Sequence, residues 1–290
     1  MPSITGVFKE GIDLVKDNYL SALGTYIVFF VFGIVLTVIV LALAAGMAGG
    51  IATGITGGGL SASNLGTEVT TLFVPIIMIV LIPIIAIILI SPIFSGIYYS
   101  LAMQAMGKKG KASLGKAFGE SIEAYKKLLW TLILTAIITF VIVVIIFVPF
   151  TIYLIASGSS AALHNNVLAV IVVVGITAIV GVIVLLALSI LFYEAVPLAM
   201  LDGTSGLAAI EKSVAIGRKY YRSIIGLIIL TALFSGLVYI VAGIISVIFS
   251  IISPIVGIIA NFVISIILDS FLVALSGFLP IVFYKRYVNA

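Results

Sequence analysis

The order of charged and apolar residues predicts a chain that crosses a membrane several times. Four long intervals contain no charged side chain: Asp17 to Glu68, Glu68 to Lys108, Lys127 to Glu194 and Arg222 to Asp269. A membrane-spanning helix needs about 20 predominantly apolar residues. The intervals therefore predict six spans, near residues 21–45, 72–98, 128–155, 167–192, 223–249 and 262–283.

Turns must separate two pairs of spans: the third from the fourth, within one interval, and the fifth from the sixth, which extends past Asp269. The polar segment Ser157–Asn166 divides the first of these. Ser253–Asn261 is expected to divide the second, and it is mostly apolar. The boundaries of the fifth and sixth spans are therefore defined less sharply than the others.

A basic amphipathic segment precedes the first, third and fifth spans: Ser3–Leu20, Ser113–Trp130 and Ser205–Arg222. The serine that begins each segment, Ser3, Ser113 or Ser205, is a predicted helix N-cap, because its side-chain oxygen can accept from free backbone N–H groups.

The middle segment has two faces at helical spacing. Its apolar positions are Leu114, Phe118, Ile122 and Tyr125. Its charged positions are Lys116, Glu120, Glu123 and Lys127, spaced for two i,i+4 ion pairs. Such a helix is expected at the membrane surface. It either packs structurally against the bundle or docks a cytoplasmic partner.

Aligning the segments on their first serines suggests an internal repeat. The matched sets include Phe8, Phe118 and Ile210; Glu10, Glu120 and Lys212; Gly11, Ser121 and Ser213; and Lys16, Lys126 and Arg218. Each unit would hold a surface helix, a span, an outer loop and a returning span. The predicted units are residues 3–105, 113–200 and 205–290, within one membrane domain.

Composition and charge predict how the chain is oriented in the membrane. The chain is 63% hydrophobic and 8% charged, and it has no cysteine, which excludes disulfides and Cys-ligated metals. With six spans, all 14 lysines and arginines fall on one side. The positive-inside rule then places both termini in the cytoplasm and the protein in the cell membrane. The cations expected to contact anionic lipid headgroups are Lys116, Lys126, Lys127, Arg218, Lys219 and Arg222.

Two carboxylates are candidate functional residues. Asp269 lies well inside the sixth predicted span, where an acid is costly and suggests function. The alternative is structural, with Asp269 near the outer interface or satisfied by Asn261, Ser265, Ser270 or backbone groups. Glu194 lies near the cytoplasmic end of the fourth span, where we expect a structural role, with pairing to a cytoplasmic lysine or arginine as one option.

Motifs for catalysis and cofactor binding are missing from the sequence. There is no phosphate-binding glycine loop with lysine, no zinc-protease motif and no Ser/His/Asp set. The single histidine, His164, has no acidic neighbour, so a metal site is not expected. We therefore expect no enzyme activity and no cofactor.

Two segments of the chain resemble poorly characterised six-helix prokaryotic membrane families. One is the pattern Phe8-x-Glu10-Gly11-Ile12 with Lys16 and Asn18-Tyr19, and the other runs from Pro197 to Ser213. One of these families is the membrane domain that accompanies some glycerophosphodiester phosphodiesterases. That family's catalytic domain has no counterpart here, so the resemblance implies an architecture and no activity. The Ile/Val-rich composition resembles that of archaeal proteins.

The sequence thus predicts an all-α, six-span helical bundle. The leading hypothesis is a non-enzymatic scaffold or accessory subunit, which contacts the lipid bilayer, anionic headgroups and a protein partner in a membrane complex, and no nucleic acid. The alternative is a transporter or channel for a small solute or lipid, using helices kinked at proline and Asp269. A lipid-metabolising enzyme is the third hypothesis.

Overall fold

A computed structural model describes residues 3–57, 65–107, 111–158 and 167–289, which form helices and no strand. The helices are α1 (Ile4–Asp17), α2 (Tyr19–Gly57), α3 (Leu65–Gly107), α4 (Leu114–Gly158), α6 (Val167–Leu191), α7 (Ala195–Leu201), α8 (Leu207–Ile252), α9 (Pro254–Phe283) and the π-helix η1 (Tyr284–Val288).

Six helical stretches are long and apolar enough to cross a membrane: Tyr19–Ala45, Leu81–Gly107, Leu114–Pro149, Val174–Leu201, Leu207–Ile252 and Pro254–Val288. The prediction of an all-α, multi-pass membrane bundle is confirmed. The predicted amphipathic segments differ in one respect. The first is a separate helix, α1. The third is followed by a kink in α8 at Tyr220, where the backbone is not helical, and the second continues into its span as the first turns of α4.

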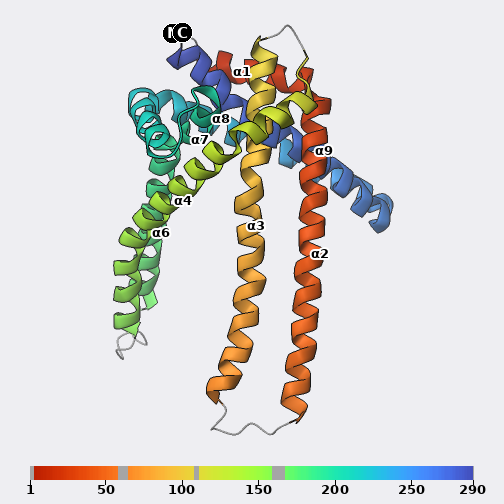
Figure 1. The fold of residues 1–290 in the computed structure, drawn as a ribbon, viewed down its shortest axis with the longest axis vertical. Coiled ribbons are helices and arrows are strands. Elements are labelled where there is room, and N and C mark those ends of the chain that lie inside the picture. The colour runs from red at the N-terminus through yellow and green to blue at the C-terminus, as the bar shows by residue number, and fades with distance from the viewer. Residues whose placement is uncertain (1–2, 58–64, 108–110, 159–166, 290) are drawn as a thin grey trace.

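The helices form three hairpins that diverge from a common hub (Figure 1). The hub is the buried cluster formed mainly by side chains from α1, α3, α7, α8 and α9. The α2/α3 hairpin runs to the bottom of the view and the α4/α6 hairpin to the lower left, while the end of α8 and the start of α9 point to the lower right. The largest fully buried side chains include Leu101, Leu198, Ile224 and Phe278, which lie in the hub. By contrast, the most apolar window of the first span contains no buried residue.

Each surface segment packs on the returning helix of a different hairpin. The first turns of α4 lie on α3, those of α8 lie on α6, and α1 lies on α9. In the first two contacts a buried serine donates to a backbone carbonyl: Ser121 Oγ to Ile93 O (2.6 Å) and Ser213 Oγ to Leu191 O (2.8 Å). In the third, Gly11 leaves room for Leu279, because a Cβ at Gly11 would lie 2.6 Å from that side chain.

A polar contact accompanies each of these packings. Glu10 on α1 forms an ion pair with Arg286 on η1 (2.7 Å). Glu120 on α4 accepts hydrogen bonds from Ser100 and Gln104 on α3. The three residues from the surface segments, Glu10, Glu120 and Lys212, occupy one column of the predicted alignment. The repeat itself stays a prediction.

The third polar contact joins Lys212 on α8 to Asp202, which follows α7. Tyr284 also donates to the Asp202 carboxylate (2.7 Å). Partial burial acts to raise the pKa of Asp202, but the hydrogen bonds from Lys212 and Tyr284 lower it by more, so this pKa lies below its ordinary value. Asp202 therefore stays ionised at neutral pH and the contact persists there.

Two details of the predicted boundaries are wrong. The turn between the fifth and sixth spans is Ser253 alone, with extended backbone, and it does not reach Asn261. Pro254 begins α9, as proline suits a first helical turn. Gly257 permits the tight reversal, because a Cβ there would lie 2.8 Å from Ser250 Cα.

The second error concerns the N-cap of the third segment. Ser205 does not cap α8; Gly206 does, with φ of 62° and no side-chain hydrogen bond. The Gly206 N–H donates to Thr131 Oγ1 on α4 (2.9 Å), and a Cβ at this position would meet the Trp130 indole. The packing on α4 therefore sets the start of α8, rather than a serine cap.

Candidate functional site

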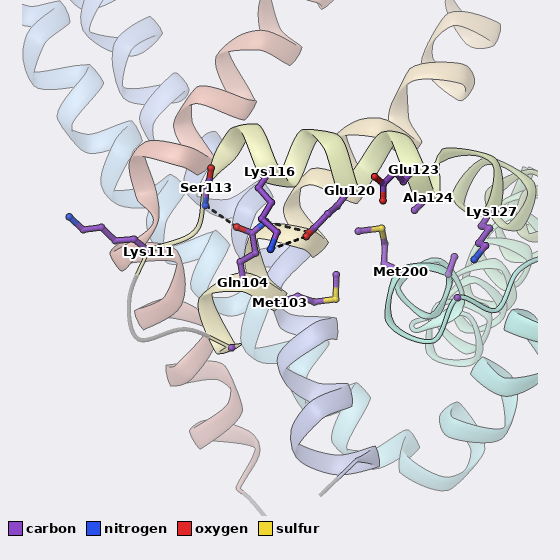
Figure 2. A pocket seen from close by; sticks show the side chains of 13 residues that line it. Met103, Gln104, Lys111, Ser113, Lys116, Glu120, Glu123, Ala124, Lys127 and Met200 are labelled. Carbon is purple, nitrogen blue, oxygen red and sulfur yellow. Dashed lines mark hydrogen bonds and ion pairs between the residues drawn. The ribbon is translucent and has the colours of Figure 1, made fainter.

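The charged face of α4 borders a cavity of about 640 Å³. Its other walls are the end of α3 and the end of α7 (Figure 2). Apolar side chains from all three elements line it, including Met103, Ala124 and Met200. The cavity thus combines an apolar wall with a charged rim.

Glu120 is the best connected charged group at this cavity. Its carboxylate accepts from Ser100 Oγ and from Gln104 Nε2 (3.3 Å), and Lys116 Nζ lies 3.5 Å away. The Gln104 Oε1 accepts the N–H of Ser113 (2.9 Å), so the start of α4 is tied to α3 by the same side chain. This network holds the charged face of α4 in place over the cavity.

The apolar face predicted for α4 packs only partly on the hub. Phe118 and Ile122, which belong to this face, are each about half exposed. The α4 side chains that are buried against the hub are Ala117, Ser121, Leu128 and Thr131. In the first turns of α4 the buried residues are small, because small side chains let the α3 and α4 backbones approach closely. Phe118 and Ile122 lie on a third face, suited to the lipid interface.

Of the two expected ion pairs on α4, one forms. Lys116 pairs with Glu120, whereas no Glu123–Lys127 pair occurs among the described ion pairs. The Lys127 ammonium instead lies at the end of α7, 3.2 Å from the position that a Cβ would take on Gly203. Glu123 and Lys127 consequently present separate charges to one cavity.

The six cations predicted to contact headgroups are all exposed: Lys116, Lys126, Lys127, Arg218, Lys219 and Arg222. Only Lys116 and Lys127 among them line the cavity. Lys219 and Arg222 lie over the rings of Tyr220 and Tyr221, at 4.9 and 5.6 Å from the ring centroids. The set is therefore divided between one concave site and a wider exposed surface.

Asp269 is bound by two tyrosines, which were not among its predicted partners. Tyr239 on α8 donates to Oδ1 (2.7 Å) and Tyr26 on α2 donates to Oδ2 (3.4 Å). The expected partner Ser270 instead contacts the Tyr19 hydroxyl (3.1 Å) and the Ile267 carbonyl. Asp269 thus joins three helices from two hairpins.

Glu194 is fully enclosed in the hub, with 1% of its surface exposed. Neither carboxylate oxygen has a hydrogen-bond partner among the described residues. The expected pairing with a cytoplasmic lysine or arginine is therefore wrong. The backbone N–H of Glu194 donates to Ser213 Oγ (3.2 Å), so the backbone at this residue is anchored while the carboxyl group is unpaired.

The predicted caps differ between segments. Ser3 accepts the Gly6 N–H through its side chain (3.0 Å). Ser113 precedes α4, and its carbonyl accepts the Ala117 N–H (2.9 Å). Within the described residues no group of three or more histidine or acidic side chains could hold a metal ion.

No protein-family model matches the chain, and no match was found among curated proteins or solved structures.

Glu194→Met is expected to raise the free energy of unfolding by about 1–3 kcal/mol, because an unpaired carboxyl group loses its hydration in the hub without gaining a partner. Thermal denaturation of the purified protein in detergent measures this as a higher melting temperature. The control Glu120→Met should lower the melting temperature, since Ser100 and Gln104 lose their acceptor. An equal decrease of the melting temperature in both variants would contradict this interpretation of Glu194.

Proposed function

We propose that the protein is a non-enzymatic membrane scaffold or accessory subunit, whose hairpins offer lateral surfaces to other membrane helices. The supporting observation is the divergence of three hairpins from one hub (Figure 1). Only 6% of the most apolar window of Leu114–Pro149 and 11% of that of Val174–Leu201 is buried within the chain. Helices that enclose a solute pathway would cover one another more fully.

The hub is compatible with this role because its contacts do not depend on the hairpin ends. Side chains from α1, α3, α7, α8 and α9 form one buried cluster there. The exposed apolar positions on the hairpins, such as Ile145, Val182 and Ile240, lie outside that cluster. A partner helix can therefore pack on a hairpin without disturbing the hub.

We further propose that the hub faces the cytoplasm, with both termini on that side. All lysines and arginines then avoid translocation, which the positive-inside bias requires. The absence of native cysteine permits single-cysteine labelling. A membrane-impermeant thiol reagent should label Asn64→Cys in intact cells, and Leu207→Cys only in inverted vesicles. Labelling of both positions from the same side would contradict six spans.

Photo-crosslinking tests the scaffold hypothesis. A photoreactive residue at Ile145, Val182 or Ile240 should give a discrete protein adduct on at least one hairpin, because these side chains are over 60% exposed. The same partner should purify from native membranes in a fixed ratio. Leu207, which is exposed on the hub, is the matched control. A monomer that forms lipid adducts only, at all three positions, would overturn the proposal.

The alternative is a transporter, and the cluster of Asp269 with Tyr26 and Tyr239 is the observation that favours it. Carboxylates inside membrane spans often serve cation or proton movement. If the protein moves protons, proteoliposomes loaded with a pH-sensitive dye should show a flux that Asp269→Asn reduces to the level of protein-free liposomes. Glu211→Gln, on the exposed surface of α8, is the control. A flux that Asp269→Asn leaves unchanged removes that residue's role.

A further inference from the structure

The cavity between α3, α4 and α7 carries a charge arrangement that the scaffold proposal does not use. Figure 2 shows Lys116, Glu120, Glu123 and Lys127 along one side of α4, with Met103 and Met200 beneath them. Lys111 also lines the cavity, but its side chain points away from this group in the view. The α4 side chains thus supply two cations and two anions.

Two of these four charges are already engaged. Lys116 pairs with Glu120, whose carboxylate is also held by Ser100 and Gln104. Glu123 and Lys127 have no ion-pair partner among the described residues, although their i,i+4 spacing would allow one. Of the four charges on α4, one carboxylate and one ammonium therefore stay free, held apart on the same wall.

A ligand that complements this wall carries an anion and a cation a short distance apart. Lysine is a common binder of phosphate, as a point charge. A carboxylate binds a primary ammonium by charge-assisted hydrogen bonds, which a quaternary ammonium cannot donate. The free pair thus fits a phosphoethanolamine group, with phosphate at Lys127 and ammonium at Glu123.

The surroundings favour a lipid over a soluble compound. Met103, Ala124, Ala199 and Met200 give the cavity an apolar wall, and methionine adapts to irregular apolar groups. Trp130, half exposed and three residues beyond Lys127, is of the residue type enriched at the membrane–water interface. The cavity is therefore expected at the depth of lipid headgroups.

We propose that this cavity binds the zwitterionic headgroup of a phosphoethanolamine lipid, with Lys127 on the phosphate and Glu123 on the ammonium. The site does not depend on the scaffold role, because it lies in the hub and away from the exposed hairpin surfaces. It also differs from general attraction to anionic lipid, which the exposed cations of α8 would share equally.

Native mass spectrometry of the purified protein in detergent tests the site with added lipid. Phosphatidylethanolamine should bind about ten-fold more tightly than phosphatidylcholine or phosphatidylglycerol, the effect expected from one charge-assisted contact. Glu123→Gln should abolish the preference over phosphatidylglycerol without weakening phosphatidylglycerol binding. Lys127→Gln should weaken all three lipids, and Lys127→Arg should restore them.

The adjacent Lys126 provides the matched control, because it carries the same charge and does not line the cavity. Lys126→Gln should change each affinity by less than about two-fold, a difference under 0.5 kcal/mol. If Lys126→Gln and Lys127→Gln act alike, or if Glu123→Gln leaves the preference intact, the proposal is wrong. If soluble O-phosphoethanolamine competes as strongly as the lipid, the site serves a soluble phosphate ester and the lipid assignment fails.

Discussion

Close packing of each surface segment on a returning helix is the constraint on which the rest of the structure depends. Gly11, Ser121 and Ser213 supply the small side chains that permit it. Within a membrane, helices gain little from apolar burial against each other, so small residues and hydrogen bonds stabilise their contacts. Because α1 packs on α9, the three contacts close into a ring and join the first hairpin to the last.

The polar contacts beside this packing differ between the three seams, where a seam is the contact of one surface segment with its returning helix. Glu10 meets Arg286, Glu120 meets Ser100 and Gln104, and Lys212 meets Asp202. The charge is reversed in the third seam, where a lysine replaces the glutamate and an aspartate provides the partner. Exchanging the third segment with either of the others would bring like charges together, because a glutamate would then face Asp202 or Lys212 would face Arg286. The charges therefore favour the third contact as observed.

The sequence supports the fold further than it supports the sites. Charge-free intervals predict six spans because a span tolerates few charges over about 20 residues. The alignment of Gly11, Ser121 and Ser213 depends only on local spacing, and these are the residues that form the close contacts. The partners were not predictable, since Gln104 meets Glu120 and Tyr239 meets Asp269 only once neighbouring helices have packed in one particular register.

The buried carboxyl of Glu194 and the cavity share one local cause, which is the break between α6 and α7. Pro197 has no N–H to donate to the carbonyl four residues earlier, so the helix is interrupted near Tyr193. Ser213 satisfies two backbone groups at the break, since its hydroxyl donates to Leu191 O and accepts the Glu194 N–H.

The two hydrogen bonds of Ser213 explain why the helix can be interrupted inside the hub, where unpaired backbone groups are costly. The short helix α7 that follows packs against α4 and forms the third wall of the cavity. Glu194 is enclosed at the junction as a consequence. A continuous α6 would leave neither an enclosed carboxyl group nor a wall beside Lys127, so the interruption gives the second hairpin a chemistry that the other two lack in the described structure.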